Sequence, residues 1–431
     1  MKKSVFIILI IIIAISSIGY VIYVEKNKEK IIPLSTEQEK VAVTEYYIYG
    51  TTLNMKGTLT IENLDFDKIE LVLYNDKDFL EYEIEYDEDG NKVNFYLSDL
   101  INEGLYLDNI EIDKRYMFIR TTKELEEKDK EGNPQYEYKY YGLENKTEYP
   151  KTTYYTMSKY NRKIEINSDN TYQTMMLNIK ENKDKEIYDI VIDAGHGGID
   201  PGTTVNEQKE TDFTLDIAKL LKEDLTKKGF TVKLTRDEDT LKEDEWFEEY
   251  GKNGRAQISH EVYAKYLFSV HINSSTSSKV KGIEIYTPSD INYELAKSIA
   301  ESIVDNTSLD YSIQKTYKRF NGVYTHNFSE SEINSSNEKA IEKGQTPYDI
   351  TTKSNYLYMI RETGGIMTGA YVDDRNEKQQ ANDYYNSNIG TEAYLMELGY
   401  LSSENDLNII KTEQKQIAEA IAKSIESNLK K

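Results

Sequence analysis

The chain has 431 residues, a net charge of -23 and no cysteine. This length allows two domains, each with a core of its own. The acidic charge argues against a nucleic-acid partner, because binding to a phosphate backbone needs an excess of lysine and arginine. The lack of cysteine excludes disulfides, thiolate zinc sites and a cysteine nucleophile.

We expect residues 1–38 to form an N-terminal membrane anchor or signal peptide, followed by a linker. Lys2 and Lys3 precede an apolar run from Val5 to Val24. About twenty helical residues at ~1.5 Å each span a hydrocarbon core of ~30 Å, which favours an uncleaved membrane helix. The alternative is a signal peptide cleaved near Ser16. Under either interpretation we expect the rest of the chain to lie outside the cytoplasm, in the cell envelope.

Residues 39–182 predict an all-β accessory domain. Apolar or aromatic residues alternate with charged ones in stretches such as 68–74 and 82–86, and turn residues separate them. This period of two is typical of half-buried strands, and short strands of this kind favour a sandwich-like domain or a barrel. Many tyrosines fall between Tyr136 and Tyr160. They suit either stacking on sugars or ordinary strand surfaces, so the ligand of this domain stays open.

Residues 183–431 predict an α/β domain. Helical patterns over 211–228, 255–265, 293–304 and 415–429 alternate with strand patterns over 188–194, 230–235, 267–272, 282–286 and 393–399. Gly229 is a natural end for the first of these helices. Such alternation predicts a mostly parallel open sheet with helices on both faces.

Two of the four histidines follow predicted strands of this domain. His196 lies among glycines after the first strand, and His271 ends the strand that begins at Leu267. Glu210 precedes a helix and can point back toward the sheet edge, while Glu397 interrupts an apolar strand. A carboxylate there is costly to bury unless it is paired or faces a site. Two histidines and one carboxylate are a common ligand set of hydrolytic zinc.

The other two histidines do not fit such a site. His260 lies within a predicted helix and has no ligand-type partner four residues later, so it does not form the metalloprotease helix motif. His326 lies in a polar stretch, and we expect it to be exposed to solvent.

Four motifs in order resemble the zinc-dependent N-acetylmuramoyl-L-alanine amidases (type 3 catalytic domain) over residues 188–429. The motifs are Ile192-Asp-Ala-Gly-His-Gly-Gly-Ile-Asp-Pro-Gly, Glu210-Thr-Asp-Phe-Thr-Leu-Asp-Ile-Ala, Ser269-Val-His-Ile-Asn-Ser and Met396-Glu-Leu-Gly-Tyr-Leu-Ser. The resemblance implies cleavage of the amide between N-acetylmuramic acid and the L-alanine of the peptide stem. It also implies His196, Glu210 and His271 as ligands of a Zn²⁺ cofactor and Glu397 as the catalytic general base.

Further residues are weaker candidates. Asn273 and Arg361 are candidates for binding substrate, and Arg255 matches a recurring arginine that we expect to be structural. Thr211 stands where the family usually has a lysine, and Ser403 where it has an asparagine.

Two long insertions, 324–355 and 367–388, interrupt the amidase-like region. Loops of this length in a compact domain often serve as lids or partner sites. We therefore expect at least one to gate substrate or to bind an activator, with surface decoration as the alternative.

Two other functions remain compatible with the sequence. One is a membrane-anchored cell-wall-binding or regulatory protein whose amidase domain is inactive. The other is a zinc peptidase that cuts within the peptide stem.

Overall fold

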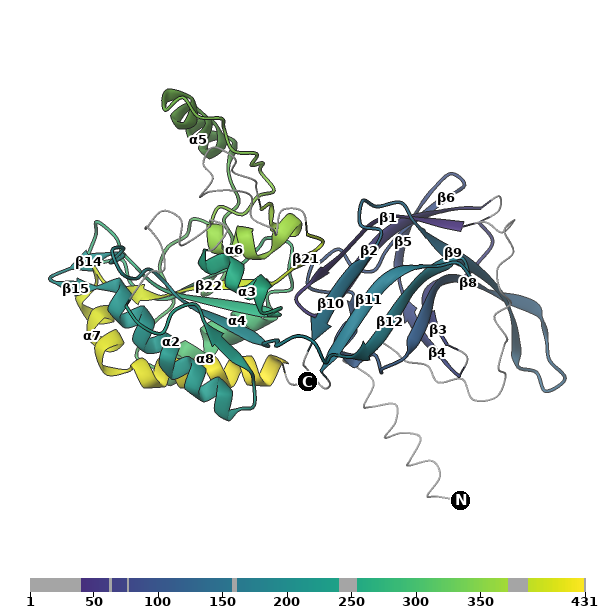
Figure 1. Ribbon diagram of the computed structural model, residues 1–431, viewed down its shortest axis with the longest axis horizontal. Helices are drawn as coiled ribbons and strands as arrows, with labels where there is room; N and C mark the ends of the chain where they lie inside the picture. The colour runs from purple at the N-terminus through teal and green to yellow at the C-terminus, as the bar shows by residue number, and fades with distance from the viewer. Residues whose placement is uncertain are drawn as a thin grey trace, which may run out of the picture.

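The computed structural model describes residues 40–61, 64–75, 77–156, 161–239, 254–370 and 387–429. Figure 1 shows two bodies side by side, a β-rich one formed by the first part of the chain and an α/β one formed by the rest. The predicted membrane segment lies outside the described residues. Within the described ranges, no helix is both long and apolar enough to cross a bilayer.

The β-rich body contains strands and one short 3-10 helix, Leu107–Asn109, over its described residues. Its sheet has the order β10-β11-β12-β8-β9-β1-β2-β6-β5, and β3 joins β8 to β4. The strands are β1 (Lys40–Tyr49), β2 (Thr52–Thr60), β3 (Lys68–Tyr74), β4 (Phe79–Glu83), β5 (Glu85–Asp89), β6 (Lys92–Tyr96), β7 (Leu105–Tyr106), β8 (Lys114–Lys128), β9 (Pro134–Asn145), β10 (Thr152–Thr156), β11 (Arg162–Asp169) and β12 (Thr174–Glu181).

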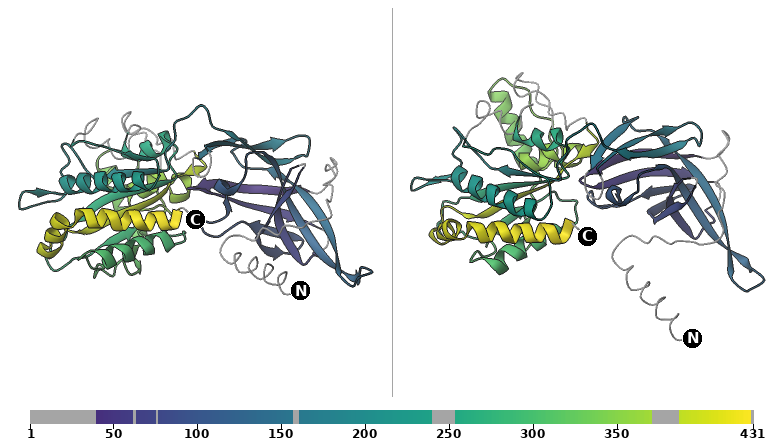
Figure 2. Two further views of the ribbon diagram at one scale, coloured as in Figure 1. Left: turned by 90° about the horizontal axis from the view of Figure 1, so that it is seen from below. Right: turned by 60° about the horizontal axis from the view of Figure 1, so that its bottom comes forward.

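This arrangement differs from the expected sandwich in one respect. The strands form one hydrogen-bonded sheet instead of two. The long strand β8 pairs with β12 near its start, with β9 along the rest of the same edge, and with β3 on the other edge. The sheet therefore branches at β8 and curls around its own core, as Figure 2 shows from two further sides.

The α/β body is built on a sheet of order β16-β13-β17-β22-β18-β20-β19. Its strands are β13 (Ile190–Ala194), β16 (Val232–Leu234), β17 (Tyr266–Asn273), β18 (Glu284–Tyr286), β19 (Lys318–Phe320), β20 (Val323–Tyr324) and β22 (Glu392–Tyr400); β14 (Thr204–Val205) and β15 (Gln208–Lys209) form a small separate hairpin. The pairs β16–β13, β13–β17 and β17–β22 are parallel, while β18 is antiparallel to β22. The α/β prediction is confirmed.

Helices cover both faces of this sheet (Figure 1). The apolar sides of α2 (Glu210–Lys227), α4 (Glu294–Asn306) and α8 (Gln414–Leu429) bury one face. On the other face, α3 (Arg255–Glu261) and α6 (Tyr358–Thr363) pack in a smaller core. A 3-10 helix, Gly365–Thr368, follows α6, and α7 (Glu404–Thr412) follows β22. Because β13, β17 and β22 run parallel, their carboxyl ends meet at one edge of the sheet.

The first insertion carries α5 (Glu330–Glu342), which projects away from the sheet in Figure 1. The expectation that His326 is exposed is wrong. Its ring is sandwiched between Tyr317 and Tyr356, with ring centroids 3.6 and 4.1 Å away, and its Nε2 lies 3.0 Å from Glu332 Oε1 on α5. Burial lowers the pKa of His326. The histidine therefore anchors the base of α5. Most of the second insertion lies outside the described residues.

The two bodies share strand pairing and buried polar contacts. β21 (Ile389–Gly390), which leads into β22, pairs in parallel with the end of β1 in the other sheet. At the start of β22, the carboxylate of Glu392 accepts hydrogen bonds from Tyr394 and from Asn102 of the β-rich body, the latter at 3.0 Å. The side chain of Glu392 is 5% exposed.

We expect Glu392→Gln to stabilise the protein at alkaline pH. Burial raises the pKa of Glu392 from 4.5 to about 7. The contribution of this group to stability is therefore fully present below pH 4.5 and is lost as the pH rises through 7. At pH 8 the free energy of unfolding of the variant should be about 3 kcal/mol higher than that of the wild-type chain. Urea denaturation of both proteins measures this difference.

Below about pH 4.5 the difference should vanish. Glu144→Gln, at an exposed carboxylate of β9, serves as the control and should change the free energy of unfolding by less than about 0.5 kcal/mol. If Glu392→Gln and the wild-type chain were equally stable at pH 8, ionisation of the buried carboxylate would not destabilise the protein, which would contradict the prediction.

Candidate active site

The candidate site begins with His196, in the turn directly after β13. His196 adopts a left-handed backbone conformation with a φ of 62°. Gly195 before it permits a close approach, because a Cβ at this position would lie 2.5 Å from Cε1 of His271. The glycine therefore allows the two imidazoles to meet, and their ring centroids lie 4.9 Å apart.

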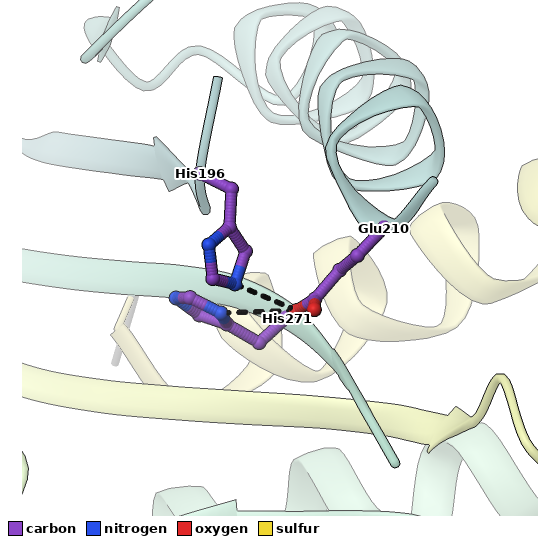
Figure 3. Close-up of side chains that lie close together, drawn as sticks. All are labelled: His196, Glu210 and His271. Carbon is purple, nitrogen blue, oxygen red and sulfur yellow. Dashed lines mark hydrogen bonds and ion pairs between the residues drawn. The ribbon is translucent and has the colours of Figure 1, made fainter. Parts of the chain in front are cut away.

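Three predicted ligands converge from three separate elements (Figure 3). His196 comes from the turn after β13, Glu210 from the first residue of α2 and His271 from β17. Glu210 Oε1 lies 3.1 Å from His196 Nε2 and 3.2 Å from His271 Nδ1. One ligand-type atom from each residue lies within 4.8 Å of the other two, so the three side chains could share one metal ion.

Backbone amides hold the carboxylate of Glu210 in place. The N–H of Ile272 donates to Oε1 at 2.9 Å, and the N–H of Thr203 donates to Oε2 at 3.0 Å. Burial opposes ionisation of Glu210, but hydrogen bonds with His196 and His271 outweigh it and keep the pKa of Glu210 well below its usual value. The acid is therefore an anion at neutral pH, as a metal ligand must be.

Asp200 orients the ring of His196 by a contact to the ring nitrogen that faces away from Glu210. Its Oδ2 lies 2.7 Å from Nδ1 of His196, which leaves Nε2 directed toward Glu210. Burial lowers the pKa of His196, but the hydrogen bonds with Asp200 and Glu210 outweigh burial and raise this pKa to about 10, so binding of a metal ion to this imidazole would release a proton. A carboxylate behind an imidazole is a common outer partner of a metal-bound histidine, because it fixes the tautomer and the ring orientation.

Glu397 lies beside the cluster on β22, in register with His271 on β17. Residues paired in this way point to the same face of a sheet. Burial raises the pKa of Glu397 well above its usual value, and the negative charges of Glu210 and Glu284 raise it further. Over the described residues, Glu397 Oε2 and His271 Nε2 are both buried without a hydrogen-bond partner.

Glu284 on β18 pairs with Glu397 on its other side and was not among the residues predicted from the sequence. This side chain is 1% exposed and accepts hydrogen bonds from Ser312 at 2.6 Å, from Tyr286 at 2.8 Å and from Tyr400. His271, Glu397 and Glu284 therefore form one row across three strands. Glu284 interrupts an apolar strand in the same way as Glu397, so the same signal could have found it.

Of the other candidate residues, Asn273 contacts this row, whereas the contacts of Arg361 and Arg255 described below are with other residues. The side chain of Asn273 donates to Glu284 at 3.4 Å. Arg361 is buried on α6, where its guanidinium donates to the carbonyl oxygens of Asn355 and Tyr356, neither of which belongs to the cluster. Arg255 donates to the buried carboxylate of Asp193 at 2.8 Å, near the carboxyl end of the strand β13 that leads to His196.

The sequence matches one family model, described as N-acetylmuramoyl-L-alanine amidase, over residues 190–427. This region is more than half of the chain and contains all four residues of the candidate site, His196, Glu210, His271 and Glu397. The chain belongs to the N-acetylmuramoyl-L-alanine amidase family. The β-rich body of this amidase-family chain lies outside the match.

Curated relatives are similar to part of this amidase-family chain. The probable cell wall amidase LytH of Staphylococcus saprophyticus is 36% identical over 129 residues, which are 29% of this chain and 39% of the relative. LytH of Staphylococcus aureus is 33% identical over 129 residues, 29% of this chain and 40% of the relative. The chain thus covers about two fifths of the length of these relatives.

A solved structure is also similar in part. N-acetylmuramoyl-L-alanine amidase AmiC2 of Nostoc punctiforme is 23% identical, and the match covers 57% of this chain and 100% of AmiC2 with a TM-score of 0.37.

Proposed function

We propose that this chain is a zinc-dependent peptidoglycan hydrolase that cleaves the amide bond between N-acetylmuramic acid and the L-alanine of the stem peptide. The observation that carries the proposal is the convergence of His196, Glu210 and His271 within 4.8 Å, at the edge of a sheet in a domain of the amidase family. Two imidazoles and one carboxylate, with a further position left for water or substrate, suit a catalytic zinc ion.

The side chains fit such an ion for a second reason. A buried nitrogen of His271 and a buried oxygen of Glu397 have no hydrogen-bond partner among the described residues. An unpaired buried polar atom carries an energetic cost, so two such atoms on residues paired across neighbouring strands support a bound group at this place. His196, Glu210 and His271 would hold the metal, and Glu397 would stay free for catalysis.

Bound zinc supplies a Lewis acid that polarises a carbonyl and lowers the pKa of a water molecule to about 7. Glu397 accepts the proton that the attacking water loses and returns it to the departing amide nitrogen. Burial favours this role, since a raised pKa makes Glu397 a stronger base than an exposed carboxylate. Asp200 keeps the imidazole of His196 in a fixed orientation throughout.

We propose that the enzyme acts outside the cytoplasm, where its substrate lies. The apolar run from Val5 to Val24 supports attachment to the membrane by an N-terminal helix, with cleavage as a signal peptide as the alternative. We also propose that an insertion, with α5 as its projecting part, receives an activator. Deleting residues 330–342 and finding unchanged turnover of peptidoglycan would contradict this role for α5.

The experiment that tests the proposed activity is an analysis of the ends created in purified peptidoglycan. After incubation with the full-length chain and zinc, we expect new L-alanine amino termini and no new reducing sugar ends. New amino termini on any other residue would instead indicate a zinc peptidase that cuts within the stem. A preparation that binds peptidoglycan without creating new ends would indicate an inactive, wall-binding protein.

A further inference from the structure

Arg236 lies just after β16 and is 7% exposed. Its guanidinium donates to three backbone carbonyls, each at 3.0 Å: Nε to Ala194, and Nη2 to Gly195 and Thr211. Nη2 also lies 3.2 Å from the hydroxyl of Thr214, which in turn donates to the carbonyl of Gly195 at 2.7 Å. One buried side chain thus contacts two separate segments of backbone.

Both segments carry a candidate metal ligand. Ala194 and Gly195 directly precede His196, and Thr211 directly follows Glu210. The guanidinium therefore bridges the strand-end turn that presents one ligand and the helix start that presents another. Because its donors lie in one rigid plane, arginine can hold several acceptors in a fixed arrangement, which a lysine cannot.

The turn that Arg236 holds has an unfavourable backbone conformation. The φ of His196 is 62°, which disfavours a residue with a side chain, and the φ of Gly197 is 136°. The turn also packs on the arginine, because a Cβ at Gly197 would lie 2.9 Å from Cδ of Arg236. The surrounding contacts must therefore maintain this conformation, and those of Arg236 reach the two carbonyls immediately before His196.

We propose that Arg236 is a positioning residue for the metal centre: it fixes His196 relative to Glu210 and so increases the affinity for zinc. This inference rests on the metal site proposed above. Electrostatics alone would act in the opposite direction, because a buried cation near the site repels a second cation. The sign of the change in zinc affinity after loss of the arginine therefore separates positioning from a simple effect of charge.

The test measures zinc affinity by competition with a chromophoric chelator, in the full-length wild-type chain and in Arg236→Gln. We expect Arg236→Gln to weaken zinc binding roughly 10- to 100-fold, the usual cost of losing an outer partner of a metal site. Arg236→Lys should also weaken binding, since it keeps the charge but loses the planar fork. Equal or tighter binding by Arg236→Gln would overturn the inference.

Two further variants keep the test decisive. Thr214→Val removes one hydroxyl of the same network with little change in shape, and should weaken zinc binding by roughly 3- to 10-fold, the worth of about one hydrogen bond, even if Arg236→Gln does not fold. Arg162→Gln is the matched control, because Arg162 is also buried and donates to backbone carbonyls, but in the β-rich body. Its zinc affinity should match that of the wild-type chain.

Zinc binding by the wild-type chain tests the proposed metal centre, and the comparison with the variants tests the role of Arg236. A wild-type chain that binds no zinc would contradict the proposed metal centre, and the role of Arg236 with it. A wild-type chain that binds zinc, alongside unchanged binding in Arg236→Gln and Thr214→Val, would contradict only the role of Arg236.

Discussion

Glu397→Gln should retain zinc and lose most hydrolytic activity, with kcat on peptidoglycan falling about 10²- to 10⁴-fold. The amide is nearly the same size as the carboxylate but cannot accept a proton from water. Because His196, Glu210 and His271 are unchanged, zinc content measured by elemental analysis should stay at the wild-type value. The measurement is the rate of release of L-alanine amino termini, with zinc content determined on the same preparation.

The matched control is the same substitution on the same strand. Glu392 lies at the start of β22, about 17 Å from Glu397 along the strand at ~3.3 Å per residue. Glu392→Gln should therefore leave kcat within about twofold of wild type, although it changes stability with pH. Wild-type turnover in Glu397→Gln would contradict the assignment of Glu397 as the general base.

His196→Ala should lose both zinc and activity. The substitution removes one of three ligands, so zinc affinity should fall by more than the roughly 10- to 100-fold cost of losing an outer partner. The fold should persist, because His196 lies in a turn at the sheet edge and outside both large hydrophobic cores. Isothermal titration with zinc, together with circular dichroism of the metal-free protein, measures the two effects separately.

His260→Ala is the control for this loss, because His260 lies on α3 and belongs to no described metal cluster. It should bind zinc with the stoichiometry of the wild-type chain. If His196→Ala bound zinc as tightly as wild type, the ion would have to be held by other residues.

The regular elements of the α/β body follow closely from sequence periodicity. The helical pattern over 211–228 corresponds to α2 (Glu210–Lys227), and Gly229 after it has a φ of 92°, a conformation that glycine adopts without strain. Pairing between strands that are far apart in the chain is harder to predict from sequence. β21 has two residues, Ile389 and Gly390, and pairs with β1 near the other end of the chain. No local pattern predicts such a contact.

His196 and His271 could be predicted because each lies at the end of an apolar strand pattern. Glu210 lies in a polar stretch, and it was predicted from its place before a helix and from the resemblance to the amidase family. The residues that support them carry a weaker signal. Arg236 follows a short strand and acts through backbone carbonyls, which are the same for every amino acid. His326 was wrongly expected in solvent, because the two tyrosines that enclose it are separated from it in the sequence and meet it only in the fold.

The most direct test of the account is a crystal structure of the zinc-loaded protein, with anomalous scattering measured on both sides of the zinc absorption edge. We expect one zinc peak, about 2.0–2.2 Å from ligand atoms of His196, Glu210 and His271, with Glu397 beside it and not bound to it. A zinc peak held by other residues, or none at this cluster in a protein that still releases L-alanine amino termini, would contradict the account.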